Sequence, residues 1–230
     1  MIALRLMITV AAVAATELLR AGTATPADSL CARMETAGMV DAAASDPAIK
    51  VSLMYGRDDN FTGAAMYPEG FATAYLHPEA AAALARAQEA LTASHPGLRL
   101  LIADAARPMS VQRKMYRTVR GTPMAPYVSN PVNGGGLHNY GLAVDITIVD
   151  ALGRELPMGT PIDHLGPEAN IDREDELVAR GTITAAERDN RLLLRRIMKE
   201  AGFMPLRSEW WHFNLRSRAE ARRRYRLLDF

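Results

Sequence analysis

Metal-binding side chains are scarce in this sequence, and that scarcity narrows the chemistry the chain can do. Its 230 residues include one cysteine, Cys31, and five histidines. A single cysteine excludes an internal disulfide and a multi-cysteine zinc site within one chain. A transition-metal site would therefore use histidine and carboxylate ligands. His77 and His95 each stand beside a proline at the end of an expected helix, where a capping or surface role is the simplest one.

His138 and Asp145 stand in the glycine-rich and apolar segment that runs from residue 134 to 148. Asp145 interrupts an apolar run, and a buried carboxylate is costly unless it is paired or binds a cation. On one straight strand, a separation of seven residues would place the two side chains on opposite faces. Asn139-Tyr140-Gly141 can bend the chain and let them converge. A metal pair and a hydrogen-bonded structural pair both stay open here.

The second segment reads Ser208-Glu209-Trp210-Trp211-His212-Phe213. Aromatic neighbours shield His212 and favour the neutral imidazole, which is the metal-binding form. Two histidines and one carboxylate leave an open position on a tetrahedral zinc for a water, whose pKa the metal lowers. Glu209 could take the proton of that water. The alternative is that the tryptophans are core residues and that Glu209 lies at the solvated end of a strand.

A third candidate is Asp104-Ala105-Ala106-Arg107-Pro108, directly after the apolar run at 98–103. An arginine between a strand end and a helix start can point into a cleft, where it would stabilise negative charge on a tetrahedral intermediate. The alternative is a surface arginine paired with Asp104, which would contribute little to stability.

The sequence contains no phosphate-binding or serine-hydrolase motif and no excess of positive charge that would attract nucleic acid. Gly134-Gly135-Gly136 lacks the Lys-Ser/Thr of a phosphate-binding loop, and no G-x-S-x-G elbow occurs. The formal net charge is +1, from 27 basic and 26 acidic residues. This balance does not indicate nucleic-acid binding by bulk positive charge, so we expect no nucleic-acid partner.

The elements that must position these residues can be read from periodicity and capping signals. Apolar patterning predicts strands, Pro78, Pro108 and the capping box at Thr184 predict helix starts, and Gly202 predicts a helix end. The expected strands are 48–55, 98–103, 142–149 and 210–215, and the expected helices are 78–94, 108–120 and 184–202, with an arginine-rich, solvated helix after Arg216. Helices and strands interleave without a regular βαβ rhythm, so we expect one α+β domain over residues 28–230.

The N-terminal residues 1–24 resemble a secretory signal peptide. Arg5 precedes an uncharged, mostly apolar run from 6 to 15, and small residues follow. The run is too short to span a bilayer, so we expect no membrane insertion of the mature chain. An ordinary N-terminal helix is the alternative. The prediction is a periplasmic or secreted protein, with a cytoplasmic location as the alternative.

Together these segments resemble the D-alanyl-D-alanine dipeptidase family, the VanX-type zinc D,D-dipeptidases. The resemblance extends from about residue 50 to 215 and includes Asp59-Asn60-Phe61-Thr62-Gly63 and the segment 157–163. It implies a single compact α+β domain with a central, mainly antiparallel sheet flanked by helices. It also implies one Zn²⁺ per chain, held by His138, Asp145 and His212. Glu209 would be the general base that activates the water and later protonates the leaving amine.

The resemblance assigns roles to four more residues. Arg107 would stabilise the oxyanion, with Asp104 orienting it. Tyr55 and Asp163 match residues that hold the ammonium group of the substrate, a small D,D-dipeptide hydrolysed to free D-alanine in bacterial cell-wall metabolism. The oligomeric state does not follow from the sequence.

The chain departs from the family pattern at a few positions. Gly136 stands where the family usually has a serine that helps to recognise the substrate amine, Asn139-Tyr140 replaces a small or basic pair, and Ala106 replaces an aromatic residue. These changes leave the zinc chemistry intact but weaken the expectation of a strict preference for free D-Ala-D-Ala. The alternatives are a zinc D,D- or L,D-carboxypeptidase acting on peptidoglycan stem peptides and a non-catalytic zinc module that binds wall peptides.

Overall fold

The computed structural model describes residues 24–230. The signal peptide predicted for residues 1–24 therefore lies outside the described chain except for its last residue, and it stays a prediction. None of the described helices is both long enough and apolar enough to cross a membrane.

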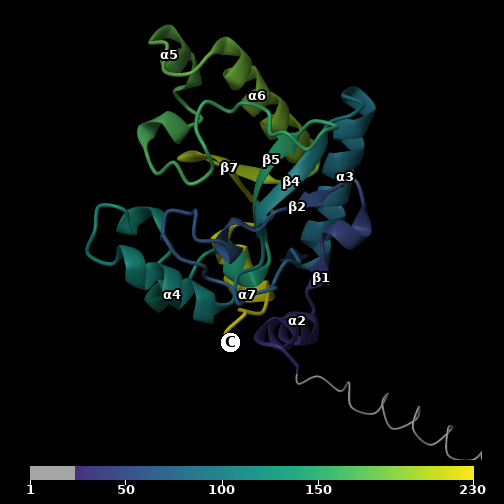
Figure 1. Cartoon of the computed structure of the whole chain (residues 1–230), viewed down its shortest axis with the longest axis vertical. Helices are drawn as coiled ribbons and strands as arrows, with labels where there is room; N and C mark the ends of the chain where they lie inside the picture. The colour runs from purple at the N-terminus through teal and green to yellow at the C-terminus, as the bar shows by residue number, and fades with distance from the viewer. Residues whose placement is uncertain (1–23) are drawn as a thin grey trace, which may run out of the picture.

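A five-stranded mixed sheet forms the centre of the molecule (Figure 1). β2 pairs with β4 in parallel, and every other pairing in this sheet is antiparallel. In spatial order the strands are β2 (Lys50–Val51), β4 (Arg99–Asp104), β5 (Ala143–Val149), β7 (Glu209–Asn214) and β6 (Met204–Leu206). A small antiparallel pair is formed by β1 (Val40–Asp41) and β3 (Tyr75–Leu76). The predicted fold class, a compact α+β domain with a mainly antiparallel sheet, is confirmed.

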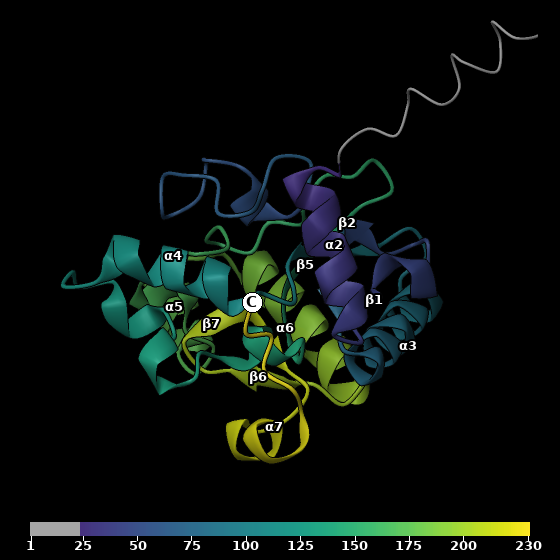
Figure 2. The ribbon, with the colours of Figure 1, turned by 90° about the horizontal axis from the view of Figure 1, so that it is seen from below.

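Helices flank this sheet. α3 (Pro78–Ser94) and α6 (Ala185–Glu200) pack against each other, α3 also contacting β4 and α6 contacting β6 and β7. In Figure 1, α4 (Met109–Val119) lies below the strands and α5 (Glu174–Ala179) above them. Figure 2 shows the C-terminal residue between α4 and α2 (Pro26–Thr36). The side chain of Arg33 on α2 stacks over the ring of Phe230, and the Ser110 amide of α4 donates to the Phe230 carbonyl.

Local capping explains where the helices begin. The Glu187 amide donates to the Thr184 hydroxyl, and the Glu187 carboxylate accepts from the Thr184 amide, which is the predicted capping box of α6. His77 caps α3 through its imidazole, which accepts a hydrogen bond from the Glu79 amide. The capping role expected for His77 is thus confirmed. α2, a helix not predicted from the sequence, begins with a second capping box, at Thr25.

The strand expected at 48–55 is shorter than predicted. Only Lys50 and Val51 pair with β4, and Tyr55 lies in a 3₁₀ turn, η2 (Met54–Gly56). The Tyr55 carbonyl accepts hydrogen bonds from the amides of Met66 and Tyr67, which draws the chain away from the sheet. Of the alternating apolar side chains, Ile49, Leu53 and Tyr55 are buried all the same and Val51 is half-buried, and the Tyr55 ring packs edge-on against Phe61 of the following loop.

A bend between His138 and β5 brings the first histidine next to the sheet. The chain forms a 3₁₀ turn, η5 (Leu137–Tyr140), and leaves it through Gly141 at φ +66°. The Gly141 amide donates to the His138 carbonyl, and the Gly141 carbonyl accepts from the His77 amide. A Cβ on Gly141 would stand 2.8 Å from the backbone nitrogen of His77 and 2.5 Å from Met39 Sδ. The bend expected at Asn139-Tyr140-Gly141 is confirmed, and it requires glycine at its last position.

Replacing Gly141 with alanine tests this requirement. Gly181 is a matched control, because its φ is +69° and nothing lies within 4 Å of an added Cβ. Gly181→Ala should cost roughly 1–2 kcal/mol for the left-handed backbone alone. Gly141→Ala should lower the free energy of unfolding by more than the control, because its Cβ collides with backbone that cannot rotate away. Urea unfolding of both variants measures the difference, and equal losses would contradict the role given to Gly141.

Candidate metal centre

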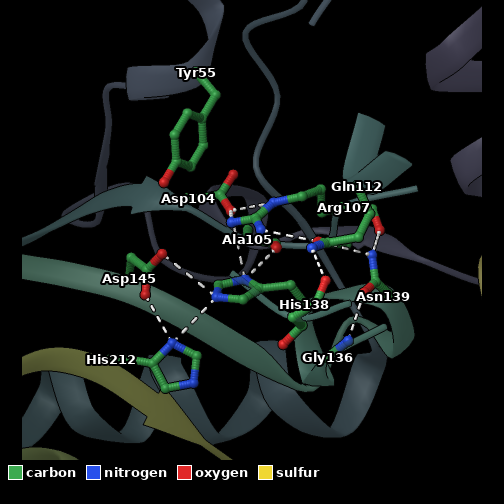
Figure 3. A network of polar contacts seen from close by, with 12 residues as sticks. Tyr55, Asp104, Ala105, Arg107, Gln112, Gly136, His138, Asn139, Asp145 and His212 are labelled. Atoms are coloured by element: carbon green, nitrogen blue, oxygen red, sulfur yellow. Dashed lines mark hydrogen bonds and ion pairs between the residues drawn. The ribbon is translucent and has the colours of Figure 1, made fainter. Parts of the chain in front are cut away.

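Three metal-ligand side chains converge at the middle of the sheet (Figure 3). Asp145 on β5 and His212 on β7 are direct cross-strand partners, and the bend at Gly141 adds His138. His212 Nδ1 lies 2.9 Å from Asp145 Oδ1 and 3.2 Å from His138 Nε2. His138 Nε2 lies 3.4 Å from Asp145 Oδ2. The sequence predicted these three residues as one ligand set, and the fold brings them together.

The remaining nitrogen of each imidazole is held by an oxygen acceptor. His138 Nδ1 lies 2.7 Å from the Ala105 carbonyl oxygen, and His212 Nε2 lies 2.9 Å from Asn214 Oδ1. Each outer nitrogen must carry hydrogen to donate, so in the neutral rings the inner nitrogens present lone pairs. Two lone pairs and a carboxylate facing one another inside the protein form a donor set for a cation. Two histidines and one carboxylate suit zinc with one coordination position left open.

The protein holds these ligands in a strongly coupled electrostatic environment. Burial alone would raise the pKa of Asp145, but the two imidazoles outweigh burial and hold it well below its usual range. Burial alone would lower the pKa of His212, but the hydrogen bond and the charge of Asp145 raise it to about 9. Without a metal, a proton therefore compensates the carboxylate, and a metal ion must displace that proton to bind.

Glu209 lies beside the ligand set and lines the same pocket. Its carboxylate is 3.9 Å from His212 Nδ1, and its side chain is only 14% exposed. Burial is the main cause that raises its pKa above the usual value for glutamate. Trp210 and Trp211 are buried, as the core interpretation predicted. Glu209, however, is not at a solvated strand end, and a partly buried carboxylate next to a metal site can act as a general base.

Arg107 is buried rather than exposed, so the surface interpretation of this arginine is wrong. Its side chain is 8% exposed, and that of Asp104 is fully buried. Arg107 donates to Asp104 Oδ2 through Nε and Nη2 and to Gln112 Oε1 through Nη1. Three of its five N–H donors are used in this way, and two remain. Asp104 Oδ2 also lies 3.5 Å from His138 Nδ1, so Asp104 joins the arginine to the ligand set.

Tyr55 and Asp163 form a polar pair in the same pocket. The Tyr55 hydroxyl donates to Asp163 Oδ2 at 2.7 Å. Burial, and secondarily the charge of Asp145, raises the pKa of Asp163 to about 7. Asp163 has φ +64° and is the one non-glycine residue with a positive φ among residues 24–230. A strained backbone maintained by its surroundings is typical of functional sites, and here it places the Asp163 carboxylate.

The pocket has a volume of about 240 Å³, which limits a ligand to a small molecule. It contains the carboxylates of Asp145, Asp163 and Glu209 and the guanidinium groups of Arg107 and Arg218. Seven of the eight residues singled out from the sequence line it, namely Tyr55, Arg107, His138, Asp145, Asp163, Glu209 and His212. Asp104 does not line the pocket but lies behind Arg107, where it can orient the guanidinium.

Three supporting residues were not predicted from the sequence. Asn214 anchors His212, and Asn139 donates to the Arg107 carbonyl and caps the Gly136 amide. Gln112 is 1% exposed and accepts from Arg107. Asn214 carried a readable signal, because residues two apart on a strand share a face. Gln112 carried a weaker one, since it is an amide on the apolar face of an amphipathic helix.

A buried cation site, a neighbouring carboxylate base and an arginine with free donors define a metal-dependent hydrolase. The profile of the D-ala-D-ala dipeptidase family of M15 peptidases matches residues 35–228. The chain belongs to this family and is a metallopeptidase.

Curated relatives agree with this assignment. A D-alanyl-D-alanine dipeptidase of Escherichia coli is 35% identical over 181 residues, covering 79% of this chain and 86% of the relative. A protein of the same name from Enterococcus faecalis is 28% identical over 70% of this chain and 83% of its own length. A third, from Streptomyces coelicolor, is 30% identical over 73% of this chain and 86% of its own length.

Metal content tests the ligand set. The purified protein loaded with zinc should hold one ion per chain, and His212→Ala and Asp145→Asn should each lose it after dialysis, because the first removes a nitrogen ligand and the second replaces the charged carboxylate by a neutral amide. Glu209→Ala is the matched control, since Glu209 lies beside the ligands without belonging to the set, and it should keep its ion. Metal analysis of the dialysed proteins decides between the outcomes. Full metal retention by His212→Ala would contradict the assignment.

Proposed function

We propose that the protein hydrolyses the dipeptide D-alanyl-D-alanine to two molecules of free D-alanine and that its metal is zinc. The observation that carries this proposal is the Asp163 carboxylate in the pocket. Its hydrogen-bond partner is the neutral Tyr55 hydroxyl, and no cationic side chain of the described chain pairs with it. A carboxylate in such surroundings favours a positively charged ligand group. The free ammonium of a dipeptide fits this requirement, and the names of the curated relatives agree.

The pocket residues divide the reaction among them. Asp163 and Tyr55 hold the ammonium and so set which carbonyl of the dipeptide faces the ligand set. Arg107, kept in place by Asp104 and Gln112, directs its remaining donors at the negative charge that develops on that carbonyl oxygen. Glu209 takes a proton from the attacking water and gives it to the leaving amine as the C–N bond breaks. A bound zinc ion would supply Lewis acidity, which polarises the carbonyl and lowers the pKa of water.

The same pair distinguishes a dipeptidase from a carboxypeptidase. A carboxypeptidase acting on stem peptides must leave the pocket open where the peptide continues, whereas a dipeptidase must recognise a free ammonium there. Asp163, paired with Tyr55, favours the dipeptidase. If residues 1–24 act as a signal peptide, the enzyme works outside the cytoplasm and recycles wall-derived dipeptide rather than blocking precursor synthesis.

A substrate panel tests the proposed function. The zinc-loaded protein should release D-alanine from D-Ala-D-Ala and should fail on N-acetyl-D-Ala-D-Ala, on a stem pentapeptide and on L-Ala-L-Ala. In the first two compounds the residue before the scissile bond carries an amide in place of the free ammonium that Asp163 would hold. Chromatographic quantification of the products measures each reaction. Hydrolysis of the acetylated compound would overturn the dipeptidase proposal.

Glu209→Ala provides the mechanistic control for this panel. Loss of one well-placed general base costs roughly 10²- to 10⁴-fold in rate. The variant should therefore keep its metal, and its kcat should fall by at least about 10²-fold. Turnover at the wild-type level would remove Glu209 from the mechanism.

The pH dependence of KM tests the role of Asp163. Protonation removes the charge that holds the ammonium, so KM for the dipeptide should rise as pH falls through the pKa of Asp163. That pKa is about 7 in the metal-free protein, and a cation at Asp145 shifts it lower. Asp163→Asn keeps a side chain that tolerates positive φ. It should raise KM roughly 10- to 100-fold, as expected for a hydrogen bond to a charged group, and flatten the acid limb. If KM of Asp163→Asn still rose at low pH as in the wild type, Asp163 would not be the group that holds the ammonium.

A further inference from the structure

The pocket contains a second arginine that the mechanism above does not use. Arg218 is the first residue of α7 (Arg218–Arg224), in the arginine-rich segment expected to be a solvated helix. Its guanidinium donates from Nη2 to the Gly135 carbonyl, and its side chain lines the same pocket as the metal ligands. No carboxylate among residues 24–230 forms an ion pair with it. Arg218 is exposed, as expected for a solvated helix, but its side chain also lines the pocket.

Ser129 supplies a hydroxyl next to the same loop. Its Oγ lies 2.6 Å from the position that a Cβ on Gly136 would take, so the serine fills the space that the glycine leaves. Its carbonyl accepts a hydrogen bond from Gln112 Nε2 at 2.7 Å, which fixes the segment. The hydroxyl has no hydrogen-bond partner within the described residues, and Ser129 lines the pocket. A cationic group and a free hydroxyl thus flank Gly135-Gly136.

This corner of the pocket is separated from the pair that would hold the ammonium. Figure 3 shows Tyr55 and Gly136 at opposite ends of the polar network, with Arg107 and His138 between them. The ammonium has its carboxylate partner at the Tyr55 end, in Asp163. At the Gly136 end, where the family resemblance implied a contact to the substrate amine, Arg218 would instead repel an ammonium and attract an anion. Guanidinium and hydroxyl groups are the donors that recognise a carboxylate.

We propose that Arg218, assisted by the Ser129 hydroxyl, binds the C-terminal carboxylate of the dipeptide. The inference rests on the proposed function and adds a specificity determinant to it. The enzyme then recognises its substrate at both ends, because Asp163 requires a free ammonium and Arg218 requires a free carboxylate, and both residues line the pocket that contains the ligand set. A pocket that binds both the ammonium and the carboxylate accepts a free dipeptide and excludes a peptide extended at either terminus.

Kinetics with D-Ala-D-Ala and its C-terminal amide, D-Ala-D-alaninamide, test the proposal. The wild type should cleave the amide with a kcat/KM roughly 10- to 100-fold below that for the acid, the effect expected for a hydrogen bond to a charged group. Arg218→Ala should raise KM for the acid by a similar factor and leave KM for the amide within about 2-fold, because the amide cannot form the ion pair. Ser129→Ala should change the same ratio in the same direction by a smaller factor.

Arg222→Ala is the matched control. Arg222 lies one turn further along α7 and donates to the Asn133 carbonyl, but it does not line the pocket. It should leave the ratio between acid and amide unchanged. If Arg218→Ala instead impairs both substrates equally, Arg218 only supports the glycine loop and the proposal is overturned. Should Arg218→Ala lose its metal or its fold, Arg218→Gln keeps a donor for the Gly135 carbonyl without the charge and must show the same selective loss.

The two proposals fail in different ways. Wild-type protein that cleaves the acid and the amide equally well would overturn the carboxylate subsite and leave the dipeptidase function intact. Wild-type protein that cleaves neither compound would overturn the dipeptidase function, and the subsite with it.

Discussion

The arrangement of the site depends on how the fold holds three electron-rich groups close together despite their mutual repulsion. His138 Nε2, His212 Nδ1 and the Asp145 carboxylate lie 2.9 to 3.4 Å apart inside the protein, with the outer nitrogens already committed to oxygen acceptors. Only a positive charge can offset this repulsion, and either a proton or a metal ion supplies it. The cross-strand pairing of β5 with β7 and the bend at Gly141 hold the atoms together against it.

One polar network connects this centre to the rest of the pocket. Asp104 contacts both Arg107 and His138, and Asn139 ties the Arg107 carbonyl to the loop that carries the histidine. Gln112 extends the connection from Arg107 to the Ser129 segment. Because each member holds two others, the arginine, the histidine and the pocket wall cannot move independently. Such a pocket is preorganised, so little reorganisation accompanies substrate binding.

The sequence predicted this site better than it predicted the elements around it. The ligand residues stand in short segments with unusual composition, such as a carboxylate inside an apolar strand, and helix starts follow local capping chemistry. The sequence-based predictions fail where tertiary contacts determine the local structure. Most of the strand expected at 48–55 does not pair, because the chain turns at Tyr55 and accepts hydrogen bonds from the following loop there. Gln112 becomes a site residue only because α4 packs beside Arg107. The strain at Asp163 has no local signal, since it results from the surroundings that hold it.

The chain order of the ligands affects when the enzyme can become active during its synthesis. His212 follows Asp145 by 67 residues, and Glu209, the proposed base, belongs to the same late strand. While residues 146–208 are being synthesised, a nascent chain therefore carries one histidine and one carboxylate of the candidate centre, with neither the third candidate ligand nor the proposed base. Translation past β7 completes both at once. A chain that ended before Glu209 would lack both the third candidate ligand and the proposed base, so the proposed mechanism requires synthesis of β7.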